Sequence, residues 1–148
     1  MSDRPSRREI VERYAAASAR HDLAELAILR HPEWTVDWPQ SGERVRGSEH
    51  FAQIIESYPG GAPRVEVTRI VGGEDRWVLT AGNTVLRVDG SGDFWWGEWT
   101  MTYPDGDAYH VVSLMELHDR RIYRERVYWA PPFEAPEWRR PFVENPPG

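Results

Sequence analysis

Glu125 is the side chain whose type and surroundings most strongly suggest chemistry. It lies in the alternating stretch Arg121 to Trp129, where Tyr123, Val127 and Trp129 share its face. A single carboxylate in an apolar pocket is poorly hydrated in its charged form, so its pKa rises and it can serve as a general acid or base. Arg124 and Arg126 flank it in the sequence, and the alternative is a solvated or arginine-paired strand residue.

Tyr14 is a second candidate for proton chemistry. It falls at helical spacing with Ile10 and Ala17 on one apolar face. A tyrosine in that position is either a core residue with a bonded hydroxyl or a donor whose hydroxyl points into a cavity.

Asp37 is the third candidate. It lies in the alternating stretch Trp34 to Pro39, in which plain alternation turns it away from Trp34 and Trp38. It becomes a general base if the strand twists its face inward, and it is otherwise a surface or turn-capping residue. The catalytic candidates are therefore Tyr14, Asp37 and Glu125.

Motifs for most other chemistries are absent from the sequence. There is no cysteine, which excludes disulfides, thiolate metal sites and cysteine nucleophiles. The five histidines form no HxH or HExxH motif, so we expect no metal. Gly90-Ser91-Gly92 joins two predicted strands and indicates a hairpin turn rather than a phosphate loop. We expect no cofactor.

Charge and hydropathy limit the partners. The formal net charge of −6 argues against nucleic acid, which is normally bound by a lysine- and arginine-rich patch. The sequence has neither an N-terminal apolar segment typical of a signal peptide nor an 18-residue apolar run. We therefore expect a cytoplasmic protein without a membrane partner.

The elements that would position the candidates come as helices first and strands afterwards. A capping box begins the first helix at Ser6 and Glu9, Asp22 caps a short second helix that Pro32 stops, and Ser48 caps a third. This order favours an α+β domain. The predicted strands cover residues 34–39, 65–71, 77–88, 94–103, 108–117 and 121–129, and the last three form a meander.

This order of elements resembles the nuclear transport factor 2-like superfamily and, within it, the SnoaL-like proteins. The resemblance also rests on the helix break at Arg20-His21-Asp22 and on Leu117-His118-Asp119-Arg120-Arg121-Ile122. It implies three N-terminal helices packed on a strongly curved antiparallel sheet that forms a cone-shaped cavity, often in homodimers. Residues 1–130 would form that domain and residues 131–148 a proline-rich C-terminal arm.

The resemblance also shows where catalytic residues of known relatives are missing. By analogy with ketosteroid isomerase, Tyr14 could be an oxyanion donor, but Trp38 stands in place of the base and Ser113 in place of the second oxyanion donor. Val127 stands where limonene epoxide hydrolase carries an aspartate. Because these residues are missing, steroid-type isomerisation and that kind of water activation are disfavoured. The fold alone does not determine which reaction a protein catalyses.

The aromatic content suggests a ligand that is hydrophobic or aromatic. The strand parity that the resemblance implies places Tyr109, Ser113 and Met115 toward the cavity, although at least half of the aromatic residues should simply fill the core. The candidate substrate-binding residues are Trp34, Trp38, Trp99, Tyr109, Ser113, Met115 and Trp129.

Three functions remain open. The first is a cofactor-free acid/base enzyme of the cyclase, isomerase or dehydratase class, with Glu125 or Asp37 as proton carrier and Tyr14 as oxyanion donor. The second is a non-catalytic ligand-binding protein, and the third a dimeric structural module. The arm aromatics Phe133, Trp138 and Phe142 are expected to pack over the cavity of their own chain or onto a neighbouring subunit.

Overall fold

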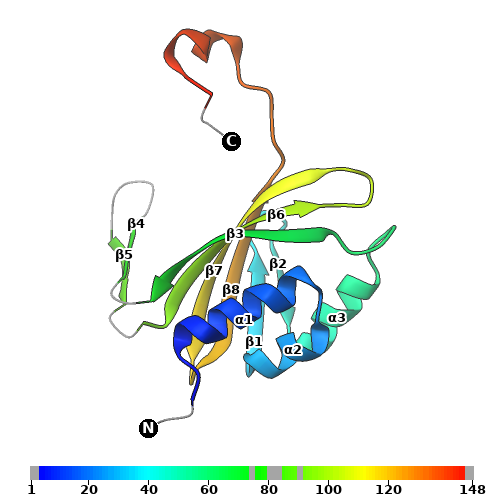
Figure 1. Ribbon diagram of the computed structural model, residues 1–148, viewed down its shortest axis with the longest axis vertical. Helices are drawn as coiled ribbons and strands as arrows, with labels where there is room; N and C mark the ends of the chain where they lie inside the picture. The colour runs from blue at the N-terminus through cyan, green and yellow to red at the C-terminus, as the bar shows by residue number, and fades with distance from the viewer. Residues whose placement is uncertain (1–3, 74–75, 80–84, 90–91, 146–148) are drawn as a thin grey trace.

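The helices and strands form the α+β arrangement expected from the sequence. The computed structural model describes residues 4–73, 76–79, 85–89 and 92–145. Its helices are α1 (Arg7–Ala19), α2 (Leu23–Leu29) and α3 (Ser48–Glu56), and they cover one face of a curved sheet (Figure 1). The strands are β1 (Arg30–Trp38), β2 (Glu43–Arg46), β3 (Arg64–Gly73), β4 (Arg76–Leu79), β5 (Val85–Asp89), β6 (Phe94–Thr102), β7 (Ala108–His118) and β8 (Arg121–Ala130).

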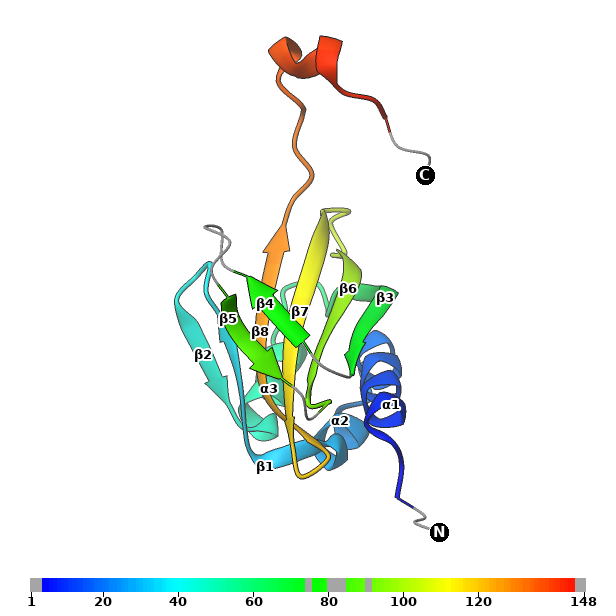
Figure 2. The same cartoon turned by 90° about the vertical axis from the view of Figure 1, so that its left-hand side faces the viewer.

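Six strands form the main sheet in the order β2-β1-β8-β7-β6-β3, and β4 and β5 form a separate two-stranded antiparallel sheet (Figure 2). The predicted meander is confirmed, because β6, β7 and β8 pair in sequence as antiparallel neighbours. The main sheet is antiparallel as expected except at one place, where β1 pairs with β8 in parallel. As a result β1, β6 and β8 run in the same direction and their carboxyl ends meet at one end of the sheet.

The predicted helix starts are partly confirmed. Ser6 and Glu9 form the reciprocal capping box of α1, and Asp22 accepts a hydrogen bond from the Glu25 amide at the start of α2. The third start differs: Gly47 caps α3, with φ 83° and ψ 150°, and no side chain caps it. These angles are open to glycine and almost closed to other residues, which explains why Gly47 rather than Ser48 occupies the cap.

The second helix ends earlier than Pro32. The chain is already extended at Arg30, and Pro32 lies inside β1. The pairing of β1 with β8 is interrupted between Arg30 and Thr35, so Pro32 sits where no amide is needed for the ladder. The predicted strand 77–88 falls on β4 and β5, and its middle, with the bulge expected at Ala81-Gly82, lies outside the described residues.

The core forms between α1, α2 and the concave face of the sheet. Trp34 on β1 and Tyr14 on α1 are its largest fully buried side chains, and they pack with Leu26, Met115 and Ile122. Burying side chains of this size contributes on the order of 2 kcal/mol each through the hydrophobic effect. These contacts fix the concave face of the sheet to α1 and α2.

Residues beyond β8 leave the body of the molecule. They run as an extended segment to a short 3-10 helix at Glu137–Phe142, well separated from the sheet in both views (Figures 1 and 2). Among the described residues, no helix has the length and apolar character needed to cross a membrane.

Candidate functional site

A cavity of about 270 Å³ lies between the helices and the concave face of the sheet. Its lining is mainly apolar, and exposed Ser41 and Glu43 mark its open end, beside the carboxyl ends of β1 and β8. The apolar and aromatic wall includes Leu26, Val36, Trp38, Phe51, Trp99, Val111, Val127 and Trp129.

Glu125 is the acidic group buried in this wall, with only 8% of its surface exposed. Two donors hold the same carboxylate oxygen: the Tyr14 hydroxyl donates to Oε2 at 2.7 Å and the Trp34 indole donates to it at 2.8 Å. Within the described residues, no hydrogen bond of good geometry reaches Oε1. The carboxyl group is therefore fixed through one oxygen and keeps the other for a different partner.

Arg30 supports this arrangement from behind. Its Nε donates to the Tyr14 hydroxyl at 2.8 Å, and one terminal nitrogen donates to Ser48 at 3.3 Å. The guanidinium carbon lies 3.6 Å from the centre of the Trp34 ring and 4.4 Å from that of Phe51. Such stacking suits the weakly hydrated guanidinium of a buried arginine.

Burial raises the pKa of Glu125 above its ordinary value of 4.5, and the charge of Arg30 and the hydrogen bonds from Tyr14 and Trp34 oppose that rise. The Ser113 hydroxyl also favours the carboxylate by its proximity, but it makes no hydrogen bond of good geometry among the described residues. The net upward direction brings the carboxyl closer to the range in which it can both take and release a proton near neutral pH.

Tyr14 has a positioning role in this geometry. Burial, followed by the nearby charge of Glu125, raises the pKa of Tyr14 well above its ordinary value, so the hydroxyl stays protonated. Its proton is directed to Glu125 and its oxygen accepts from Arg30. The expected role as oxyanion donor to a substrate is not supported, because the hydroxyl proton is already engaged.

Asp37 lies away from the cavity. It forms an ion pair with Arg44 through two hydrogen bonds of 2.5 and 2.8 Å, and Arg126 lies opposite it on β8. The hydrogen bond from Arg44 lowers the pKa of Asp37. The inward twist that would make it a base does not occur, and its surroundings are those of a surface carboxylate.

The candidate substrate-binding residues fall into three groups. Trp38, Trp99, Ser113 and Trp129 line the cavity. Trp34 does not line the cavity, and its indole donates a hydrogen bond to Glu125. Met115 and Tyr109 do not line the cavity: Met115 is buried in the core, and Tyr109 packs against Tyr103 with ring centres 5.5 Å apart.

Arg30 is the residue that the sequence analysis missed. It follows Leu26 and Leu29, two buried residues of α2, and this position at the end of an apolar stripe is its one sequence signal. The sequence contains exposed arginines in similar surroundings, Arg13 and Arg20 among them. Burial of Arg30 depends on the short β1 segment before the interruption, which sequence periodicity does not reveal.

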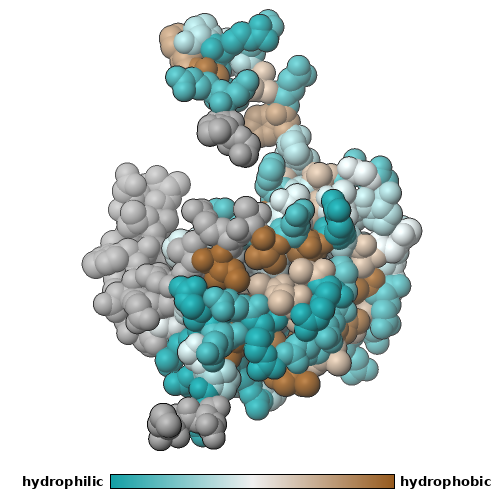
Figure 3. Space-filling view, in the orientation of Figure 1, coloured by the Kyte–Doolittle hydropathy of each residue, from teal (hydrophilic) through white to brown (hydrophobic). Residues whose placement is uncertain are grey.

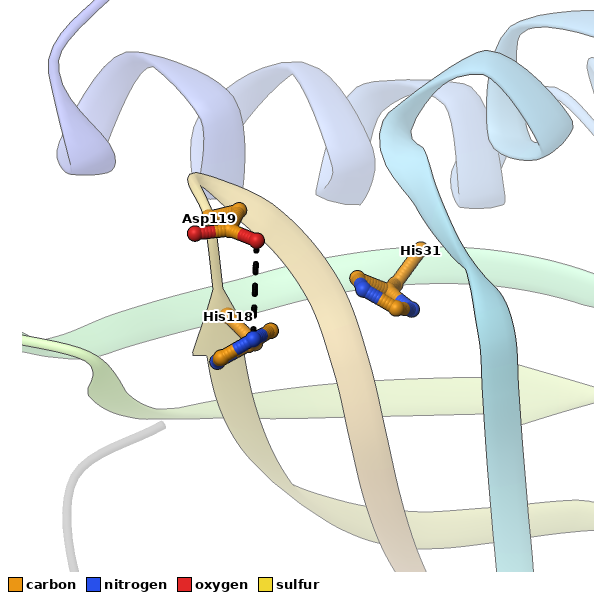
Figure 4. Close-up of side chains that lie close together, drawn as sticks. All are labelled: His31, His118 and Asp119. Carbon is orange, nitrogen blue, oxygen red and sulfur yellow. Dashed lines mark ion pairs between the residues drawn. The ribbon is translucent and has the colours of Figure 1, made fainter.

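A second cluster of potential ligands lies outside the cavity (Figure 4). His31, His118 and Asp119 offer ligand atoms within 4.8 Å of one another. The Nδ1 atom of His31 accepts a hydrogen bond from the Glu33 amide at 3.0 Å. In the neutral ring the proton therefore lies on Nε2, and Nε2 then has no lone pair with which to bind a cation. His118 and Asp119 are largely exposed. None of the three residues lines the cavity.

Comparison with known proteins agrees with this architecture. Residues 11–125 match the sequence model of the SnoaL-like domain. An NTF-2 like protein of unknown function from Burkholderia xenovorans shares 29% identity over 95% of each chain, with a TM-score of 0.71. A putative ketosteroid isomerase from Kribbella flavida shares 22% identity over 96% of this chain and 90% of that one, with a TM-score of 0.72.

A more distant similarity links the chain to an LEH-like epoxide hydrolase from M. tuberculosis, with 17% identity, a TM-score of 0.56, and coverage of 82% of this chain and 80% of that one. At these low identities the two named enzymes support the fold alone. No curated protein matches the chain.

Proposed function

Because this chain belongs to the SnoaL-like domain family and holds a buried carboxyl in an apolar cavity, we propose that it transfers a proton on a small hydrophobic molecule without a cofactor. Glu125 is the proton carrier. The observation that carries the proposal is the asymmetric support of its carboxyl group, with two donors on Oε2 and none of good geometry, within the described residues, on Oε1.

This support suits both protonation states. Oε2 accepts from Tyr14 and Trp34 as a carboxylate oxygen and also as the carbonyl oxygen of a protonated acid. The proton is therefore gained and lost at Oε1 without rearrangement of the donors. A base that needs no reorganisation lowers the barrier to proton transfer.

The substrate class follows from the cavity wall. A volume of about 270 Å³ lies near the lower end of the range for small-molecule sites, and the mainly apolar lining includes seven aromatic side chains. A compact ketone with one ring or two fused rings fits these properties. In the proposed step the α C–H bond breaks, an O–H bond forms at Oε1 of Glu125, and the electron pair passes to the carbonyl oxygen as an enolate. Isomerisation, cyclisation and dehydration can each start from such a proton transfer.

The proposal is tested by deuterium exchange, which requires no knowledge of the natural substrate. In D2O at neutral pH, the protein should accelerate exchange of the α-protons of 2-tetralone, followed by proton NMR. Glu125→Gln should lower the protein-dependent rate by about 100-fold or more, the usual contribution of a general base. Asp37→Asn is the matched control and should retain the rate. Equal rates in the wild type and Glu125→Gln would contradict the role of Glu125.

Binding without turnover is the second candidate function. It is favoured by the same network, because Arg30, Tyr14 and Trp34 also satisfy Glu125 as a purely structural buried charge. Under this alternative, 2-tetralone and its hydrocarbon analogue tetralin would raise the melting temperature, because both bind the native state. Exchange would then stay at the buffer rate.

A further inference from the structure

The C-terminal arm carries its largest side chains into solvent. Phe133, Trp138 and Phe142 are 79%, 73% and 81% exposed, and Val143 beside them is also exposed. Figure 3 shows hydrophobic residues on the arm, clear of the body. Three large aromatics so close together in sequence are unusual for a free tail, because exposed aromatic surface is unfavourable in water.

The arm is stiff where it leaves the body. Pro131 and Pro132 follow β8 directly, and Pro136 has φ −59° and ψ 137°, the polyproline II conformation. A segment of this kind extends about 3 Å per residue, so residues 131–136 span on the order of 20 Å. The arm therefore holds its aromatic residues away from the cavity of its own chain.

The open end of the cavity offers a matching surface. Trp38 and Trp129 meet there edge to face, with ring centres 5.9 Å apart, and Tyr103 lies across the opening at the start of the β6–β7 turn. Glu43 adds an exposed acid to this rim. The arm carries Glu134, Glu137 and Glu144 as well as Arg139 and Arg140, so net charge does not select this rim. The match between arm and rim rests on their aromatic side chains.

We propose that two copies of this chain exchange their arms, so that the arm of each copy covers the cavity opening of the other. A large aromatic side chain buries about 150 to 250 Å². Six such side chains in a two-fold symmetric pair would bury roughly 900 Å² or more before their contact surfaces are counted, which places the complete interface in the range of stable dimers. This exchange does not depend on any reaction at Glu125.

Cysteine cross-linking tests the exchange in the full-length protein. The chain has no cysteine, so introduced thiols are the only ones present. One chain carries Glu137→Cys in the arm, and a second chain, lengthened by a tag, carries Ser41→Cys at the rim. After the two are refolded together and oxidised, we expect a disulfide-linked pair containing one chain of each length. Glu137→Cys paired with Glu12→Cys on α1 is the control and should not cross-link.

Docking of the arm onto its own chain gives a different result. A chain with both Glu137→Cys and Ser41→Cys would then form an internal disulfide and run as a monomer on a non-reducing gel, and the mixed pair would not form. Either that pattern or the absence of any cross-link between arm and rim would overturn the proposal.

A second measurement examines the aromatic residues themselves. In a full-length variant with Phe133→Ser, Trp138→Ser and Phe142→Ser, the dissociation constant of the dimer should rise at least tenfold. Analytical ultracentrifugation measures it. The fold of the variant should be intact by circular dichroism, because all three side chains are exposed in the single chain. A dimer of unchanged affinity, or a monomeric wild type, would refute arm exchange.

Discussion

At the scale of single residues, the site is a chain of three groups in which each orients the next. Arg30 donates to Tyr14, and Tyr14 donates to Glu125. The positive charge of Arg30 compensates a carboxylate that burial alone would disfavour. Because Tyr14 lies between them, compensation acts without a direct ion pair, and Glu125 remains able to take up a proton.

The raised pKa of Glu125 predicts a pH-dependent contribution to stability. Below about pH 4.5 the carboxyl is protonated in both the folded and the unfolded chain. Above that pH the unfolded chain loses this proton first, so the folded state binds more protons and stability falls as the pH rises toward the folded pKa. The free energy of unfolding of the wild type, minus that of Glu125→Gln, should therefore decrease across this range. Urea unfolding at a series of pH values measures it.

The difference between the two proteins isolates Glu125, because the remaining groups titrate in both. The difference in the free energy of unfolding between the wild type and Asp37→Asn should change with pH in the opposite direction. The pKa of Asp37 is lowered, so the stabilising effect of its charge is lost as the pH falls through the folded pKa. A wild type that gains stability over Glu125→Gln as the pH rises toward 4.5, and keeps that gain at higher pH, would show that the pKa of Glu125 is lowered instead.

Removing the Tyr14 hydroxyl should affect both of its neighbours. In Tyr14→Phe, Arg30 loses a buried acceptor and Glu125 loses a donor, which should reduce the free energy of unfolding by about 1 to 3 kcal/mol. The pKa of Glu125 should rise further, because the lost hydrogen bond favoured the carboxylate. Denaturant unfolding and carbon-13 NMR titration of the carboxyl report the two effects. Tyr128→Phe, at a partly exposed position, is the control and should change neither.

At the scale of elements, strand alternation predicted much of the cavity wall. Val111, Ser113 and Val127 line the cavity as the expected parity places them. Tyr109 and Met115 share the parity of Ser113 but do not line the cavity: Met115 packs in the buried core and Tyr109 packs against Tyr103. Periodicity identifies the face of a strand, while the extent of a cavity along it depends on the curvature of the whole sheet.

The parity of β6 could not be predicted, because tryptophans occupy both of its faces. The register resolves it: Trp99 pairs with Val111, and both line the cavity, while Trp96 lies on the opposite face beside Leu114. Arg30 escaped prediction for a related reason, since the irregular start of β1 has neither helical nor strand periodicity.

The cap of α3 gives a prediction at this scale. Gly47 has φ 83° and ψ 150°, and an added Cβ atom would meet nothing within 4 Å. Gly47→Ala should therefore act through backbone strain alone and reduce the free energy of unfolding by about 1 to 3 kcal/mol. Gln53→Ala, at an exposed position of the same helix, should change it by less than about 0.5 kcal/mol. Thermal and urea unfolding compare the two, and a Gly47→Ala variant as stable as wild type would contradict the strained cap.

At the scale of the whole molecule, the cavity allows a direct test of where a ligand binds. Val127→Trp should fill the cavity and abolish the rise in melting temperature that 2-tetralone gives, since no ligand then binds the native state. Val112→Trp adds the same side chain to the partly exposed opposite face of β7 and should retain the rise. Differential scanning fluorimetry reports both results. An equal loss in the two variants would mean that the ligand binds elsewhere.

The strand that carries Glu125 also continues without a break into the arm. If the arm of one copy closes the cavity of the other, ligand retention and self-association are thermodynamically linked. A ligand that binds the closed form more tightly must strengthen the dimer by the same factor. The apparent affinity for ligand should then depend on protein concentration, and dilution alone would favour ligand release.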